Sequence, residues 1–279
     1  MYDPKGNGKE KTVEAVQFVE AEPPAHLRGI VHRYVYLRTQ GMLAEEYRFH
    51  ALPDACAYIV FDQSDPTITG VSKLSAASEE FNLGRTFHFV NIRLLPGVWQ
   101  DSKEPISYGQ LNTPYTGDLP LVDVNRALAR RDFGDMSDIL SGFIERLLQD
   151  GMVAPNPVTA QIFQHLDEIH TVADMAEIVG LSARQLQRTL KRTTGFAPHD
   201  FLKVLRLQMA LNGNDTWSYA DQSHFIHSFR RATGYTPGRV SVARLSISRS
   251  KTALWKRRVW GRQVDRSCDR SFQSGSLVL

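Results

Sequence analysis

The sequence predicts an α+β protein, with a β-rich amino-terminal part followed by an all-α carboxyl-terminal part. Short runs of β-branched and aromatic residues dominate the first third of the chain. Two short helices separated by a tight turn are predicted at 171–195, and a similar unit recurs at 222–237. A chain of 279 residues is long enough to form two such parts.

The first part begins with a polar segment, residues 1–12, for which we expect a flexible start. Residues 13–121 are expected to form a β-rich domain, because β-branched and aromatic side chains fit a pleated, half-buried surface. Pro, Gly and Asp residues divide this domain into four expected strands, at 29–38, 57–62, 67–74 and 86–94.

Residues 122–154 are predicted to form a helical connector. Up to Gln149 the apolar residues recur at helical spacing, with Ile139, Phe143 and Leu147 on one face. Two interpretations remain open, since this face can pair two subunits or pack on the β-rich domain of its own chain. The Pro-containing segment 154–157 then predicts a stiff, extended linker.

Two short helices are predicted next. Thr171 with Asp174, and Ser182 with Gln185, have the spacing of a capping box, in which two side chains satisfy free backbone N–H groups at a helix start. Gly180 lies between the helices, where a positive φ costs glycine little. A helix-turn-helix is therefore expected.

The second of these helices has two distinct faces. Leu186 and Leu190 are four residues apart and are expected to face inward with Leu181. The other face is polar and basic, at positions i, i+3, i+4 and i+7: Arg184, Gln187, Arg188 and Lys191. Reading the DNA major groove requires such a helix, although the solvated face of an ordinary helical pair has the same pattern.

The second copy favours the first of these interpretations. Leu186 matches Phe225, 39 positions further on, and Gly195 matches Gly234 at the same offset. A repeated supersecondary unit is a much stronger signal than one copy. The polar face of the second copy is expected to carry four residues: His224, His227, Ser228 and Arg231.

On these motifs the segment 157–240 resembles the AraC/XylS family of transcriptional regulators. The resemblance implies an AraC-type DNA-binding domain, placed here at 155–244, with two helix-turn-helix subdomains bridged by a long helix. Residues 198–211 fit that bridge, with a length of about 21 Å at 1.5 Å per residue. The family's two recognition helices enter successive major grooves, roughly 34 Å apart.

The resemblance also implies roles for individual side chains. The expected contacts to DNA bases are Arg184, Gln187, Arg188, Gln222, Ser223, His224 and His227. The expected contacts to phosphates, which carry no sequence information, are Lys191, Arg192, Arg230 and Arg231.

One departure from the family pattern concerns the second unit. The stretch between the bridging helix and the second recognition helix is about ten residues too short for the family's positioning helix. The turn-forming residues 212–215 cannot supply it. We therefore expect a well-formed first unit and a less firmly oriented second recognition helix. The alternative is a ligand-binding or interaction protein whose DNA-binding domain is degenerate.

The β-rich part resembles, more weakly, the cupin-like sensor domain of some AraC-type regulators. This resemblance implies control by a small-molecule effector, whose binding residues the sequence does not identify. The expected partners are double-stranded DNA, a small-molecule effector, a second copy of the chain in a homodimer, and RNA polymerase.

No enzymatic chemistry is expected. His88 lacks the neighbouring histidine of a cupin metal site, and His224 and His227 have no third ligand nearby. Cys56 and Cys268 are too few for a disulfide framework, and Cys56 is expected to be a buried, small apolar residue near a strand. The sequence thus predicts no catalytic residue, metal or other cofactor.

We also expect a cytoplasmic protein with no membrane partner, because no signal peptide or membrane-spanning apolar run is present. Residues 245–279 form a basic tail. From Arg239 onward there are ten Lys and Arg against two Asp and Glu, within a net charge of +3 for the whole chain. The tail is expected to be disordered, although it could add nonspecific phosphate contacts.

Overall fold

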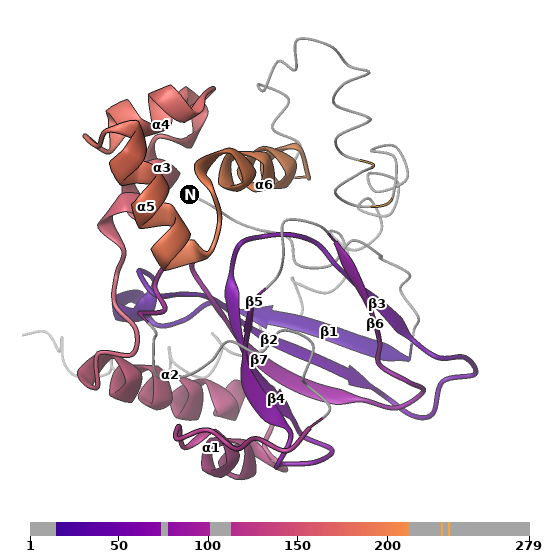
Figure 1. Ribbon diagram of the computed structural model, residues 1–279. Coiled ribbons are helices and arrows are strands. Elements are labelled where there is room, and N and C mark those ends of the chain that lie inside the picture. Colours follow the sequence, from indigo (N-terminus) through magenta and orange to yellow (C-terminus); the bar gives the residue numbers. More distant parts are fainter. Residues whose placement is uncertain (1–14, 74–77, 101–112, 212–229, 231–233, 235–279) are drawn as a thin grey trace, which may run out of the picture.

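The computed structural model describes residues 15–73, 78–100, 113–211, 230 and 234 (Figure 1). Within them, an amino-terminal β-sheet region is followed by helices, which is the α+β arrangement predicted from the sequence. The main sheet is antiparallel and has the strand order β1-β2-β7-β4-β5. Its strands are β1 (Val16–Ala21), β2 (Val31–Thr39), β4 (Ala57–Asp62), β5 (Thr69–Lys73) and β7 (His88–Leu94).

A second, two-stranded ladder pairs β3 (Arg48–Ala51) with β6 (Glu79–Asn82). These strands and β1 were not among the four expected, whereas the expected strand at 57–62 coincides with β4. A short 3₁₀ turn, η1 (Ala25–Leu27), precedes β2. The other expected strands overlap β2, β5 and β7, and their ends differ from the expected ones by at most two residues.

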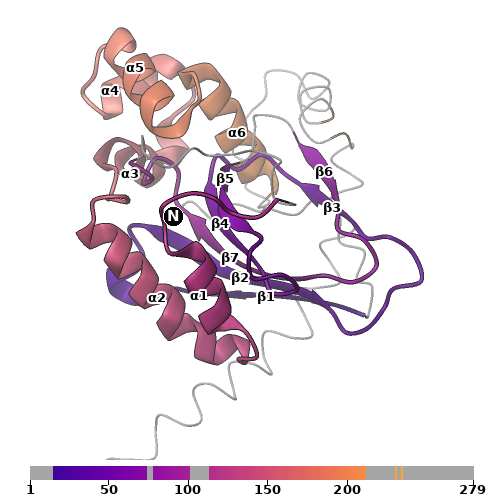
Figure 2. The ribbon, with the colours of Figure 1, turned by 60° about the horizontal axis from the view of Figure 1, so that its bottom comes forward.

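Two helices, α1 (Leu121–Leu128) and α2 (Phe133–Gln149), cover one face of the main sheet (Figure 2). Arg130, with a φ of +61°, interrupts the helical run expected up to residue 149. The apolar face of α2 packs in the same core as the strands, where Leu140 and Ile144 meet Phe61 and Ile92, all 0% exposed. The face that could have paired two subunits therefore lies inside its own chain.

The remaining helices form a second unit with its own core. They are α3 (Pro157–Gln164), the 3₁₀ turn η2 (Leu166–Glu168), α4 (Val172–Ile178), α5 (Ala183–Thr194) and α6 (Pro198–Leu211). The fully buried members of this core come from α4, α5 and α6: Met175, Leu186, Leu190, Phe201 and Leu205. α6 lies nearest the sheet, with α4 and α5 beyond it (Figures 1 and 2).

The linker between the two parts is shorter than the predicted 154–157. Pro157 is already the first residue of α3, where proline is favoured because its missing N–H is not needed. Asn156 caps this helix by accepting hydrogen bonds from the N–H groups of Val158 and Thr159. The Ala154 N–H donates to the Val98 carbonyl, so only Pro155 separates this contact from the cap.

None of the helices in the described part of the chain combines the length and hydropathy needed to cross a membrane. Over the same residues, no group of three or more His, Cys, Asp or Glu side chains is arranged to hold a metal ion.

Candidate nucleic-acid interface

Both predicted capping boxes are confirmed. At the start of α4, the Asp174 N–H donates to Thr171 Oγ1 over 3.1 Å, and the Asp174 carboxylate accepts from the Thr171 N–H over 2.9 Å. The hydrogen bond from the Thr171 side chain is the main cause that lowers the pKa of Asp174. At the start of α5, the Gln185 N–H donates to Ser182 Oγ over 3.3 Å and Gln185 Oε1 accepts from the Ser182 N–H over 2.9 Å.

The two glycines adopt the conformations that the turns require. Gly180, between α4 and α5, has a φ of +63°, as predicted. Gly195, directly after α5, has a φ of +77° and its N–H donates to the Lys191 carbonyl over 3.1 Å. A left-handed glycine at this position ends a helix and satisfies one of its last carbonyls. The length of α5 is thus fixed at both ends.

One face of α5 is held from behind. Leu186 and Leu190 are 0% exposed and contact the core that also contains residues of α4 and α6. Leu181 is partly buried against the same core. The inward orientation predicted for these three leucines is confirmed.

The opposite face of α5 is open to solvent. Its five polar side chains are all exposed: Arg184, Gln187, Arg188, Lys191 and Arg192. The Lys191 ammonium donates to the Gly195 carbonyl over 3.0 Å, so this residue also stabilises the end of its own helix. The other four make no hydrogen bond or ion pair through their side chains to the described residues. Apart from Lys191, the side chains of this face can therefore reach a ligand without first breaking contacts to the described residues.

The second copy of the unit is described at two residues. Arg230 is helical and exposed, and Gly234 has a φ of +75° with its N–H donating to the Arg230 carbonyl over 2.7 Å. Lys191 and Gly195 form the same helix end 39 positions earlier, which is the offset of the repeat. Five expected contact residues lie outside the described residues, as does the shortened connection before them: Gln222, Ser223, His224, His227 and Arg231. The segments 1–12 and 245–279 are also outside them.

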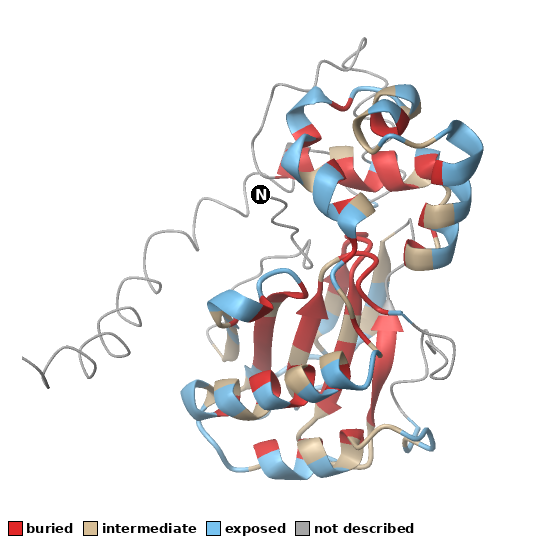
Figure 3. Cartoon of the chain, turned by 90° about the vertical axis from the view of Figure 1, so that its left-hand side faces the viewer, coloured by how far each residue is buried: buried red, intermediate tan, exposed pale blue. Residues whose placement is uncertain are grey.

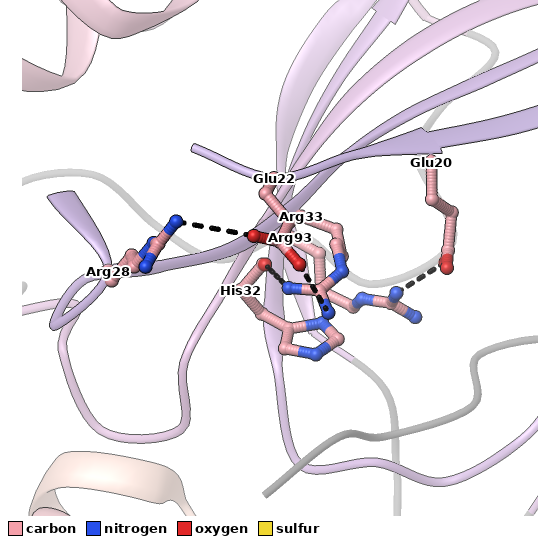
Figure 4. A network of polar contacts seen from close by, with 6 residues as sticks. All are labelled: Glu20, Glu22, Arg28, His32, Arg33 and Arg93. Atoms are coloured by element: carbon pink, nitrogen blue, oxygen red, sulfur yellow. Dashed lines mark hydrogen bonds and ion pairs between the residues drawn. The ribbon is translucent and has the colours of Figure 1, made fainter. Parts of the chain in front are cut away.

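A buried polar cluster on the sheet was missed by the sequence analysis. Arg93 of β7 is 2% exposed and donates to Glu20 of β1 over 2.5 Å (Figure 4). Asp54 is 0% exposed and accepts hydrogen bonds from the Cys56 N–H and the Tyr58 hydroxyl. Burial raises the pKa of Asp54, while the charge of Arg93 opposes this rise. Arg93 lies on the face of β7 opposite Val90, Ile92 and Leu94, and the local sequence does not show that this face is covered at its position.

A neighbouring surface cluster surrounds Glu22. Its carboxylate contacts Arg28 over 3.3 Å and Arg33 over 3.7 Å, and Arg33 also donates to the His32 carbonyl (Figure 4). Arg28 and Glu22 are both more than half exposed, so this pair contributes little to stability.

No protein-family model matches the chain. The HTH-type transcriptional regulator YidL of Escherichia coli is 33% identical over 92 residues, which are 29% of this chain and 31% of the relative. The HTH-type transcriptional activator RhaS of Escherichia fergusonii is 32% identical over 100 residues, which are 32% of this chain and 36% of the relative. The chain thus spans about a third of the length of these curated relatives.

Two solved structures of ToxT from Vibrio cholerae are also similar. One covers 82% of this chain and 97% of its own, with 8% identity and a TM-score of 0.32. The other covers 84% of this chain and all of its own, with 9% identity and a TM-score of 0.37.

Proposed function

We propose that this chain is a sequence-specific DNA-binding transcriptional regulator of the AraC/XylS type, with α5 as its first recognition helix. The observation that carries the proposal is that one side of α5 is buried and the opposite side is exposed. Leu186 and Leu190 are fully buried, while Arg184, Gln187 and Arg188 are exposed and free to bind. The names of the relatives, both helix-turn-helix regulators, support it.

The chemistry of the exposed face suits the edges of DNA bases. Arg184 and Arg188 can each donate two hydrogen bonds to guanine, and Gln187 can pair with adenine. Lys191 and Arg192 lie in the last turn of α5 and would bind phosphates, which set the position of the helix on the duplex.

A second recognition helix would complete the reading of the site. In the proposal Gln222, Ser223, His224 and His227 contact bases, while Arg230 and Arg231 contact phosphates. The matching helix ends at Gly195 and Gly234 support two units of the same design. α6, with 14 residues, would bridge them.

Control by a small-molecule effector of the amino-terminal part belongs to the same proposal. Such an effector must bind two arrangements of the chain with different affinity, because equal affinity shifts no population. Homodimerisation and contact with RNA polymerase are further parts of it. A dimer would need a surface other than the apolar face of α2, which the sheet covers.

The proposal is tested with the substitution Arg188→Ala. We expect DNA affinity to fall by about 1–3 kcal/mol and preference for the bases under that side chain to relax. The measurement is fluorescence anisotropy on fragments that gel shifts select from genomic DNA in the presence of competitor.

The matched control is Arg146→Ala, which removes the same charge from an exposed position on α2. Its affinity for DNA should equal that of the unmodified protein. Equal losses for both variants, with binding that ignores sequence and depends only on salt, would contradict the proposal. They would favour a ligand-binding or interaction protein with a degenerate DNA-binding domain.

A further inference from the structure

Two segments leave the same end of the main sheet and contact the helical part. Ala57, the first residue of β4, pairs with Leu94, the last residue of β7. The segment 52–56, which leads into β4, and the segment 95–98, which follows β7, therefore lie side by side where they join the sheet. Figure 3 shows buried chain where the helices meet this end of the sheet.

The segment 52–56 enters the helical part. All five residues are buried, and Ala55 belongs to the apolar core of the helical part. Its φ of +57° is uncommon for alanine, so surrounding contacts must hold it. Gln208 of α6 is 1% exposed and donates through Nε2 to the Pro53 carbonyl over 2.8 Å.

The second segment holds the start of α3. Asn156 Nδ2 donates to the Gly97 carbonyl over 2.9 Å, and Thr159 Oγ1 donates to the Pro96 carbonyl over 2.9 Å. Both donors are buried. If either hydrogen bond were lost, its donor and acceptor would be left without a partner, because water does not reach them. The helical part is thus attached to the sheet at two points, through α3 and through α6.

The segment 52–56 is also supported from within the sheet. Asp54 accepts from the Cys56 N–H over 3.0 Å and from the Tyr58 hydroxyl over 2.5 Å. Arg93 attracts this carboxylate and is bound to Glu20 on β1. Val90, Ile92 and Leu94 face α2, so Arg93 lies on the other face of the sheet.

We propose that the segment 52–56 couples the sheet to α6, so that a change at the Glu20–Arg93 pair reaches the helical part through Asp54, Pro53 and Gln208. The path starts at the Glu20–Arg93 ion pair, and Arg93 lies opposite Tyr58 in the pairing of β7 with β4. Tyr58 donates to Asp54, which is bonded through the chain to Pro53, and the Pro53 carbonyl accepts from Gln208. The role of this coupling in controlling DNA binding rests on the proposed function. The coupling between the sheet and α6 itself does not depend on that function.

The test is amide hydrogen exchange on the full chain. Gln208→Met removes the donor and keeps the side-chain volume, leaving the Pro53 carbonyl unpaired. We expect exchange in 52–56 and in α6 to become about tenfold faster together, while the central strands β2 and β7 keep their protection.

Glu20→Gln tests transmission from the far strand. Since Glu20 binds Arg93 and lies on β1, the exchange rates of 52–56 and α6 should change together, by about threefold or more. The control is Tyr34→Phe, which removes the hydrogen bond between Tyr34 and Ser141 inside the core of the sheet and α2. It should leave α6 unchanged.

The inference is overturned if α6 loses protection while 52–56 does not, or if the Tyr34→Phe control has the same effect on α6 as Gln208→Met. DNA affinity of the same proteins separates the two proposals. Absence of specific binding by the unmodified chain contradicts the proposed function and leaves the coupled exchange intact. Specific binding with uncoupled exchange contradicts only the coupling.

Discussion

At the scale of single residues, Gly97 permits the contact between the end of β7 and the start of α3. Its φ of +81° lies in the left-handed region, and a Cβ there would be 2.7 Å from Asn156 Nδ2 and 3.2 Å from Thr159 Cγ2. Asn156 and Thr159 are the two donors that hold α3 to this turn. Any side chain at position 97 would therefore strain the backbone and displace the helix cap.

The substitution Gly97→Ala should lower the free energy of unfolding by about 2 kcal/mol or more, because strain and lost hydrogen bonds add. Urea denaturation measures the change. Gly142→Ala is the control, since Gly142 lies within α2 with nothing within 4 Å of an added Cβ. It should raise the free energy of unfolding by about 0.5–1 kcal/mol. A stability loss at Gly142 as large as at Gly97 would argue against a specific role for the turn.

At the scale of elements, α5 owes its position to its two ends as much as to its buried face. The capping box of Ser182 and Gln185 fixes the first turn, and the left-handed Gly195 ends the last one. Three of its twelve residues are threonines, which favour helices less than the other nine, and a helix of this length is marginal on its own in water. Its ends therefore matter for the presentation of the arginines between them.

Ser182→Ala should lower the free energy of unfolding by about 1 kcal/mol, because the Gln185 N–H loses its acceptor. The measurement is chemical denaturation followed by circular dichroism. Ser137→Ala, within α2, is the control and should change stability little, since alanine is favoured inside a helix. If the cap did not stabilise the protein, the two variants would have the same free energy of unfolding.

The sequence predicted some elements closely and missed others, for physical reasons. α5 and α6 have local signals for their starts, in a capping box and a proline, and α6 spans the predicted bridge 198–211. β3 and β6 have four residues each and lack a run of β-branched side chains, so local pattern could not identify them. β1, with the sequence VQFVEA, is mostly apolar, but its exposed residues include Phe18 as well as Glu20, so it shows neither a regular alternation nor a continuous apolar run.

The contacts between the two parts were beyond sequence reasoning for a different reason. Gln208 lies 155 positions from Pro53, and nothing local distinguishes it from an exposed glutamine on an amphipathic helix. The cap at Asn156-Pro157 does have a recognised local pattern, which was interpreted as a linker instead. The exposed arginines of α5 were found because their spacing alone defines the face.

At the scale of the whole molecule, the net charge of +3 is small for a chain of this length. In the proposed function, attraction to DNA must therefore come from local groups of basic side chains. Each phosphate contact contributes a slope of about −0.9 to the plot of log affinity against log salt concentration. The salt dependence thus reports how many cationic side chains meet the backbone.

Arg230→Ala should make that slope shallower by about 0.9 and weaken binding to all sequences to a similar extent. Binding titrations at several salt concentrations provide the measurement, with Arg146→Ala as the control that leaves the slope unchanged. An unaltered slope for Arg230→Ala would mean that the helix end at Gly234 lies away from the duplex, and that the first unit reads the site alone.

The burial of the Cys56 thiol makes its reactivity a measure of contact between the two parts of the chain. It is 0% exposed, and burial raises its pKa, so it is protected from electrophiles while the chain is closed. It lies between Ala55 and β4, at the junction of the two parts. The rate of alkylation at Cys56, distinguished from Cys268 by peptide mapping, therefore measures how often the sheet and the helices separate. The protein carries this chemical reporter without any engineered label.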